Sequence, residues 1–453
     1  MKEKIRIASG QGFWGDLPNA PIDQITKGPI DYLVLDYLAE VTMSILQKQK
    51  LRDSKKGFAT DFVELMKTIL SLAKEKNVKI ISNAGGVNPI ECAREIEKIA
   101  REKNIKIKIG IVFGDDILNE IENIQNIGIE FKNLDTGENI SSIKNKIVSA
   151  NVYFGADGIV EALKNGAECI ITGRVTDAGM TLAPLIYEFG WDKNDYDKLA
   201  SGIVAGHILE CGAQSTGGNC SLDWETIPDL AHVGFPIVEA FSDGTFFVTK
   251  HKNSGGRVSV ATVSEQLVYE IGDPKNYITP DCITDFTSIE LLQVEENVVK
   301  VFGVKGNAPT EYLKISMAYA DGFRTFGTLT FSWPNALKKA KLADEIIRKR
   351  VSDLGLNFEE IYSEFVGFNS TLGKSATDEE KLNEVLLRIG AHSHDEKSLK
   401  LFLKQIPPIV LTGPPGVTGY LGALPKPMEV FSYWPTLIPK NLVEPKINYI
   451  EVK

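Results

Sequence analysis

Two groups of residues in this 453-residue sequence combine side chains that can move protons or hold an anion. The first is the run His207-Ile-Leu-Glu210-Cys211-Gly-Ala-Gln214-Ser-Thr216-Gly217-Gly218. On a helix that starts near residue 196, Glu210 follows His207 by three positions and shares its face. A carboxylate beside an imidazole fixes the tautomer and raises the pKa, which suits general acid–base catalysis. A satisfied core histidine and a His/Glu/Cys metal site are the alternatives, although the spacing matches no standard zinc pattern.

The second group follows the predicted strands of the first half of the chain. We expect strands, apolar over most of their length, at Ile5–Ser9, Tyr32–Tyr37, Val78–Ser82, Ile105–Phe113 and Cys169–Thr172. Glycines and polar residues come at or soon after their ends: Gly10 and Gly12; Asp36 and Glu40; Asn83, Gly85, Gly86 and Asn88; Asp115 and Asp116; Arg174 and Asp177. Because ligands bind at the carboxyl ends of parallel strands, these residues predict one pocket.

We expect two kinds of role in this pocket. The residues predicted to transfer protons are Asp36, Glu40, Asp115, His207 and Glu210. Those predicted to contact an anionic ligand are Gly10, Gly12, Asn83, Gly85, Gly86, Asn88, Asp116, Arg174, Asp177, Gln214, Thr216 and Gly217. A divalent metal held by Asp36, Glu40 and Asp115 is a variant of this hypothesis. Helix capping alone is the alternative explanation for Asn88, Asp116 and Asp177.

The run Gly10-Gln-Gly12-Phe-Trp-Gly15 matches the GxGxxG fingerprint of dinucleotide-binding folds. That fingerprint requires a helix that begins within the motif, so that its N-terminus faces the pyrophosphate. Here Pro18 and Pro21 follow three residues apart, which a helix interior does not tolerate. The sequence therefore predicts a tight glycine loop of another purpose and argues against NAD as a cofactor.

The predicted strands alternate with amphipathic helices. One covers 61–76, a second begins after Asn88 with Pro89 at its first position, and a third runs from Asp177 to Gly190. This alternation predicts an α/β fold, with a parallel βα-repeat domain over residues 1–225 and an open Rossmann-like sheet favoured over a barrel. The stretch 119–150 is interpreted as a polar insertion.

The pattern of predicted strands and helices changes after residue 225. We expect an α+β domain over 226–405, with strands that include 244–250 and 257–263 and helices at 335–352 and 378–390. Residues 406–453, rich in Pro and Gly, are predicted to form an arm packed on the body.

Composition sets outer limits on function. Sixty acidic residues against 50 basic ones give a net charge of −10, which argues against a nucleic-acid surface. No stretch is apolar over the length that spans a bilayer. Five scattered cysteines without a CxxC pair fit reduced thiols. We therefore expect a cytoplasmic protein that binds a small anionic substrate and neither membranes nor nucleic acid.

Several longer blocks resemble one family. They are 12–16 (Gly-Phe-Trp-Gly-Asp), 33–40, 59–62, 82–89, 171–177, 205–214, 265–274 and 413–419. In this order they are similar to the acyclic terpene utilisation protein A (AtuA) family. The resemblance carries over no catalytic residue.

The resemblance implies a place in acyl-CoA metabolism. It implies an enzyme of acyl-CoA or related organic-acid catabolism, terpenoid or branched-chain, of the lyase, hydratase or isomerase type. A CoA thioester would then be a substrate rather than a cofactor. The alternative is a non-catalytic binding or scaffold subunit of an acyl-CoA carboxylase-like assembly. Many relatives carry a small C-terminal ferredoxin-like domain, and this chain stops at Lys453 without it. We therefore expect a separate small partner chain of that fold or a loss of the domain. We also expect a homo-oligomer.

Overall fold

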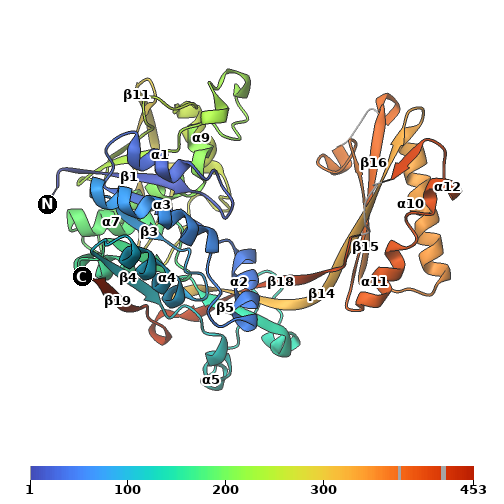
Figure 1. The fold of residues 1–453 in the computed structure, drawn as a ribbon, viewed down its shortest axis with the longest axis horizontal. Helices are drawn as coiled ribbons and strands as arrows, with labels where there is room; N and C mark the ends of the chain where they lie inside the picture. Colours follow the sequence, from blue (N-terminus) through green and yellow to red (C-terminus); the bar gives the residue numbers. More distant parts are fainter. Residues whose placement is uncertain (1, 376–378, 420–424) are drawn as a thin grey trace. The chain divides into compact units, whose positions relative to one another are not determined.

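The structure of the chain is a computed structural model. It describes residues 2–375, 379–419 and 425–453, apart from the side chains of Glu40, Val41 and Glu380. The chain divides into two compact units (Figure 1). The first comprises the residues up to Ala318 together with Tyr433–Lys453, and the second comprises Tyr319–Ser432.

The first unit is built on an open ten-stranded sheet whose centre is parallel. The central strands, in spatial order, are β1 (Lys4–Gln11), β2 (Tyr32–Leu35), β3 (Lys79–Ser82), β6 (Cys169–Thr172) and β4 (Ile107–Phe113). All residues of β2 and β6 are buried, as expected for parallel strands covered on both faces. The five predicted strands and the open parallel sheet are thereby confirmed.

Antiparallel strands extend this centre at both edges. β7 (Ile237–Phe241), β8 (Phe246–Thr249), β12 (Val298–Phe302) and β11 (Glu290–Glu295) continue from β1. At the other edge, β19 (Lys446–Val452) pairs with β4. The compact units therefore have other bounds than the predicted segments 1–225, 226–405 and 406–453, because pieces of all three segments share one sheet.

Helices cover both faces of the sheet. Leu33 packs into a core with α3 (Thr60–Lys76) and α4 (Pro89–Glu102), beside α1 (Ala20–Thr26). The hydroxyl of its neighbour Tyr32 donates to Glu188 of α7 (Gly179–Phe189), 2.6 Å away. Since adjacent strand residues point to opposite faces, α7 lies across the sheet from α3 and α4. The remaining helices include α2 (Glu40–Arg52), α6 (Asp157–Lys164) and α8 (Tyr196–Glu210).

Two segments of the first unit differ from expectation. The predicted polar insertion contains α5 (Ile121–Asn126) but ends in an unpredicted strand, β5 (Ile147–Val152). The predicted strand 257–263 is wrong, because α9 (Val260–Val268) begins there. Ser259 caps this helix by accepting from the Thr262 N–H, a local bond that outweighs the strand preference of the valines. A separate small sheet follows α9 in the sequence. It consists of β13 (Lys305–Asn307), β10 (Ile283–Asp285) and β9 (Tyr277–Ile278).

The second unit has a β-α-β-β-α-β core. Its elements are β14 (Tyr312–Ser332, which begins in the first unit), α10 (Ala336–Asp353), β15 (Glu360–Val366), β16 (Glu384–Ser393), α11 (Glu396–Leu403), α12 (Ile409–Thr412) and β17 (Val417–Gly419). The spatial order β15-β16-β14-β17, with antiparallel neighbours, is the split β-α-β arrangement of ferredoxin-like folds. The chain returns through β18 (Met428–Pro439), which pairs with β14.

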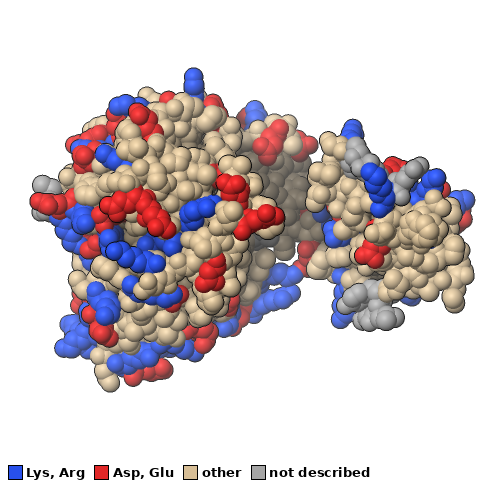
Figure 2. Space-filling view, turned by 90° about the horizontal axis from the view of Figure 1, so that it is seen from above, with Lys and Arg blue, Asp and Glu red and all other residues tan. Residues whose placement is uncertain are grey.

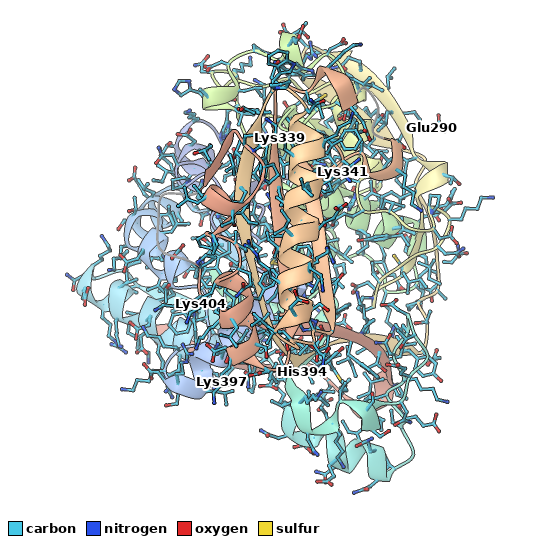
Figure 3. The ribbon with its side chains drawn as sticks, turned by 90° about the vertical axis from the view of Figure 1, so that its right-hand side faces the viewer. Glu290, Lys339, Lys341, His394, Lys397 and Lys404 are labelled. Carbon is cyan, nitrogen blue, oxygen red and sulfur yellow. The ribbon has the colours of Figure 1, made fainter. Side chains whose placement is uncertain are left out.

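One face of the second sheet is covered by helices. Leu329, Phe331 and Leu387 pack against Ala340 and Ile347 of α10. Figure 3 faces this helix, with Lys339 and Lys341 labelled on it. The predicted helix 335–352 is confirmed. The predicted helix 378–390 is wrong, because residues 384–393 form β16, a strand whose alternate side chains are buried.

The surface mixes both signs of charge. On the face shown in Figure 2, Lys and Arg side chains lie between Asp and Glu side chains. Among the helices of the described residues, none combines the length and apolar content needed to cross a membrane.

Candidate functional site

A cavity of about 1020 Å³ lies in the first unit, lined in part by residues that follow the parallel strands. It is bordered by Gly12 after β1, Asp36 after β2, and Arg174 and Asp177 after β6. Glu210 and Gln214 border it from the end of α8 and the turn that follows. Three of the five predicted strand ends therefore meet at one cavity, whereas the residues after β3 and β4 do not line it.

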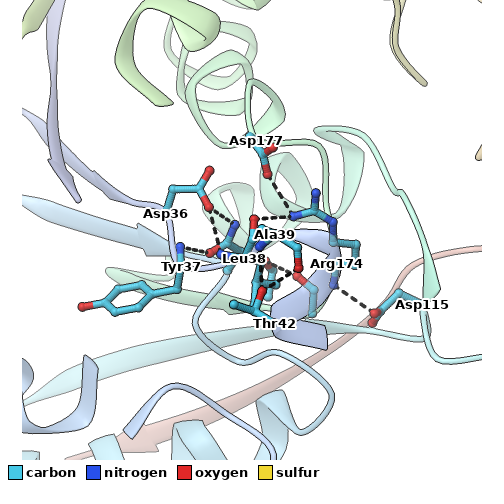
Figure 4. A network of polar contacts seen from close by, with 11 residues as sticks. Asp36, Tyr37, Leu38, Ala39, Thr42, Asp115, Arg174 and Asp177 are labelled. Atoms are coloured by element: carbon cyan, nitrogen blue, oxygen red, sulfur yellow. Dashed lines mark hydrogen bonds and ion pairs between the residues drawn. The ribbon is translucent and has the colours of Figure 1, made fainter. Parts of the chain in front are cut away.

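Arg174 is a charged group that lines this cavity, and its side chain is only 3% exposed. Its Nη1 donates to the Leu38 carbonyl at 3.1 Å and to Asp177 Oδ1 at 3.0 Å (Figure 4). The guanidinium also lies over the Tyr153 ring, 4.2 Å from its centroid. Burial lowers the pKa of Arg174, but the interactions with Asp177, Tyr153 and Asp36 are stronger, so the pKa is raised overall. The cavity wall thus carries a permanent cation held in place on two sides.

Asp36 is a carboxyl group of this cavity that is poised to titrate near neutral pH. Its Oδ1 accepts from Asn83 Nδ2 at 2.7 Å and from the Leu38 N–H at 3.1 Å. Burial raises its pKa to about 6, although the Asn83 hydrogen bond and the charge of Arg174 oppose the rise. Asn83 also accepts from the Tyr37 N–H, so it orients Asp36 from behind and does not line the cavity.

Asp115 lies outside the cavity lining. Its Oδ2 accepts from Asn151 Nδ2 at 2.8 Å and from the Arg174 backbone N–H at 2.9 Å. Figure 4 shows it on the backbone side of Arg174, away from Asp177. A side chain on Gly173 would lie 2.1 Å from Asp115 Oδ1, so glycine permits this approach. The geometry gives Asp115 the part of positioning the Arg174 backbone, whereas the sequence analysis placed it among the proton-transfer groups.

His207 and Glu210 form a buried pair in which only Glu210 lines the cavity. His207 Nδ1 lies 2.7 Å from Glu210 Oε1, and Nε2 lies 2.9 Å from the Gln266 carbonyl. Burial alone would lower the pKa of His207, but Glu210 and the carbonyl outweigh it and raise the pKa. Cys211 also lines the cavity, and burial raises the pKa of its thiol to about 12, which keeps it protonated.

The predicted glycines lie where neighbouring atoms leave no room for a side chain. Gly12 lines the cavity, and a side chain on it would lie 2.5 Å from the Gly212 backbone nitrogen. Its N–H donates to Asp16 Oδ2, which closes the loop. Gly10 packs against Leu33 and Leu35, and Gly85 packs against the Thr172 carbonyl. The loop after β1 therefore continues against the end of α8, and the helix that follows, α1, begins only at Ala20.

The remaining predicted ligand contacts lie outside the lining. Gly86 has a positive φ and packs on Leu46, and Asn88 donates to the Ser54 and Lys56 carbonyls. Asp116 accepts from the Leu118 N–H and pairs with Lys50. Thr216 donates to the Ala213 carbonyl, and Gly217 turns the chain with φ 102°. These residues shape the loops around the cavity.

The predicted metal site would need several ligands close together. Among the residues whose side chains are described, no three His, Cys, Asp or Glu are grouped so that they could hold a metal ion. The side chain of Glu40, one of its proposed ligands, lies outside the described part of the structure. Asp115, another, faces the Arg174 backbone. The metal site stays a prediction.

Several cavity residues were not predicted from the sequence. Tyr153 follows the unpredicted strand β5, and Lys314 and Tyr312 belong to β14. Tyr277 and Glu270 come from the segment after α9. Their positions depend on pairings between distant strands, so the local sequence carries no signal for them.

The fold and the cavity define an α/β protein with an acid–base group and a buried cation at the ends of its parallel strands. The chain belongs to the acyclic terpene utilisation family, since the model described as "Acyclic terpene utilisation family protein AtuA" matches residues 5–449. This match confirms the resemblance and indicates a role in acyclic terpene utilisation. Neither a curated protein nor a solved structure matches the chain.

Proposed function

We propose that this protein is an acid–base enzyme of the lyase, hydratase or isomerase type. Its substrate would be an organic acid or acyl-CoA thioester formed during the catabolism of acyclic terpenoid or branched carbon chains. The observation that carries the proposal is the His207–Glu210 pair, 2.7 Å apart, whose carboxylate lines the same cavity as Asp36 and Arg174. Catalytic carboxyl groups with perturbed surroundings cluster in such cavities.

Four residues have distinct roles in the proposed reaction. Glu210 takes the proton from the carbon next to the substrate carbonyl, and His207 stabilises Glu210 through its Nδ1 proton. Arg174 binds the oxygen on which negative charge develops, because a buried guanidinium needs little rearrangement to do so. Asp36, with a pKa of about 6, gives a proton to the product side. After both transfers Glu210 holds one proton more and Asp36 one fewer, and proton exchange with water restores both groups.

The test is exchange of hydrogen for deuterium at that carbon. Wild-type protein is incubated in deuterated water with branched organic acids and their CoA thioesters, and exchange or hydration is followed by nuclear magnetic resonance. We expect Glu210→Gln to slow exchange by about 100-fold or more, the usual contribution of a general base. Glu290→Gln, at an exposed position on β11, is the matched control and should leave the rate unchanged.

Absence of exchange and hydration with every wild-type mixture would overturn the proposal. The alternative of a non-catalytic binding or scaffold subunit would then be favoured.

A further inference from the structure

The charges of the cavity restrict the ligand that it can take. Its described lining includes more acidic than basic residues: Asp16, Asp36, Asp177, Glu210 and Glu270 against Arg174 and Lys314. The CoA portion of a thioester carries several phosphate charges, and like charges in a partly buried site repel strongly. The lining therefore disfavours a polyphosphate group far more than a ligand with a single negative charge.

Arg174 supplies the place for that charge. Its Nη1 is taken by the Leu38 carbonyl and by Asp177, whereas its Nε is buried and has no hydrogen-bond partner among the described residues. Because Arg174 lines the cavity, its guanidinium is a cation that a ligand anion can approach there. A carboxylate fits best, because its two oxygens match the fork of guanidinium N–H groups.

The outer part of the cavity is apolar and exposed. Phe13, Ile278 and Tyr312 all line the cavity, yet they are 61%, 59% and 50% exposed. Leu134, which is 52% exposed, lines it as well. Large apolar side chains gathered around a polar cavity provide the surface that a hydrocarbon segment buries on binding.

We infer that the cavity binds a free monocarboxylic acid with an apolar body, rather than the CoA thioester of that acid. The carboxylate lies against Arg174, and the apolar body lies against Phe13, Ile278 and Tyr312. This inference rests on the proposed function and narrows its substrate class to the free acid.

Isothermal titration calorimetry with inert ligands tests the inference. Butanoate, hexanoate and octanoate should bind with an affinity that rises about fourfold for each added methylene. Octanamide, which lacks the charge, and octanoyl-CoA should each bind at least tenfold more weakly than octanoate. An octanoyl-CoA or free CoA affinity above that of octanoate would overturn the inference, as would equal affinities for butanoate and octanoate.

Variants locate the two ends of the ligand. Arg174→Met should remove the preference for octanoate over octanamide. The double variant Phe13→Ser/Tyr312→Ser should remove most of the dependence on chain length, whereas Leu292→Ser, 53% exposed on β11, should keep it. If Arg174→Met does not fold, as judged by circular dichroism, the double variant and the wild-type ligand series still decide the outcome.

Failure of this inference can be told apart from failure of the proposed function. Octanoate binding as expected without exchange of any substrate would overturn the enzyme proposal and keep the ligand class. Exchange of a CoA thioester without octanoate binding would keep the enzyme proposal and overturn the ligand class.

Discussion

His207 Nδ1 lies 2.7 Å from Glu210 Oε1, while its Nε2 faces the carbonyl of Gln266. A carbonyl oxygen can only accept, so Nε2 carries a proton, and the remaining proton of the pair is shared between Nδ1 and the carboxylate. His207 is 1% exposed and does not line the cavity. It is therefore a positioning residue, and Glu210 is the group that reaches the ligand.

Replacing His207 by Gln should change the pH dependence of stability. The folded-state pKa of His207 is raised, so its contribution to stability is complete below about pH 6.5, the unfolded value, and is lost as the pH rises through the folded pKa. His207→Gln should lower the free energy of unfolding by about 1–3 kcal/mol at pH 6, with a smaller loss at pH 9. Urea titrations at both pH values measure this, and an equal loss at both would contradict it.

Replacing Asp115 by Asn should make the melting temperature less sensitive to pH. Burial raises the pKa of Asp115 from 3.8 to about 6. Between these values the unfolded chain binds fewer protons than the folded one, so rising pH favours unfolding by up to about 3 kcal/mol. An Asn at this position accepts the same N–H bonds without the charge. Wild type should lose stability from pH 4 to pH 7 relative to Asp115→Asn in calorimetry, and parallel curves would argue against this.

Replacing Gly173 by Ala should disturb Arg174 without touching the cavity. The added carbon would lie 2.1 Å from Asp115 Oδ1, so the carboxyl group must move away from the Arg174 N–H. We expect a loss of about 1–3 kcal/mol in unfolding free energy and weaker octanoate binding. Gly272→Ala is the control, because nothing lies within 4 Å of its added carbon. Similar binding by both variants would show that Asp115 does not position Arg174.

Replacing Asp36 by Asn should alter the alkaline limb of the pH profile of the exchange reaction. With a pKa of about 6, Asp36 is mostly protonated below this pH and loses the proton that it donates as the pH rises above it. The wild-type rate should bend near pH 6, and Asp36→Asn should lose both this bend and about 100-fold of the rate. An unchanged pH profile in the variant would remove Asp36 from the proton-transfer steps.

Local sequence patterns predicted the elements where burial is simple. β2 and β6 are apolar along their length because helices cover both faces, and the helix after Asn88 begins with Pro89 as predicted. The prediction failed at 378–390, where a central strand of the second sheet contains Leu387 and Ile389. A short apolar run of this kind has no period that separates a helix from a strand, so its partner strands decided.

The candidate site was only partly predictable for a related reason. Polar residues follow all five strands, so the sequence predicted that all five strand ends meet at one pocket. In the sheet, β6 lies between β3 and β4. Of the five strand ends, only those of β1, β2 and β6 line the cavity. Asn83 and Asp115 instead bind the residues that do line it, Asp36 and the backbone of Arg174. Residue type indicated their polarity and hydrogen-bonding capacity, but not which partner they would reach.

By itself, the sequence determined the α/β alternation, the capped helices, the family and the pairing of His207 with Glu210, since all of these depend on nearby residues or on matched blocks. Only the tertiary structure decided the rest. It closed the cavity with Tyr153, Tyr277 and Lys314, and it set a ferredoxin-like unit between Ala318 and Tyr433. These features depend on contacts between strands far apart in the chain, which the pattern of any one segment does not record.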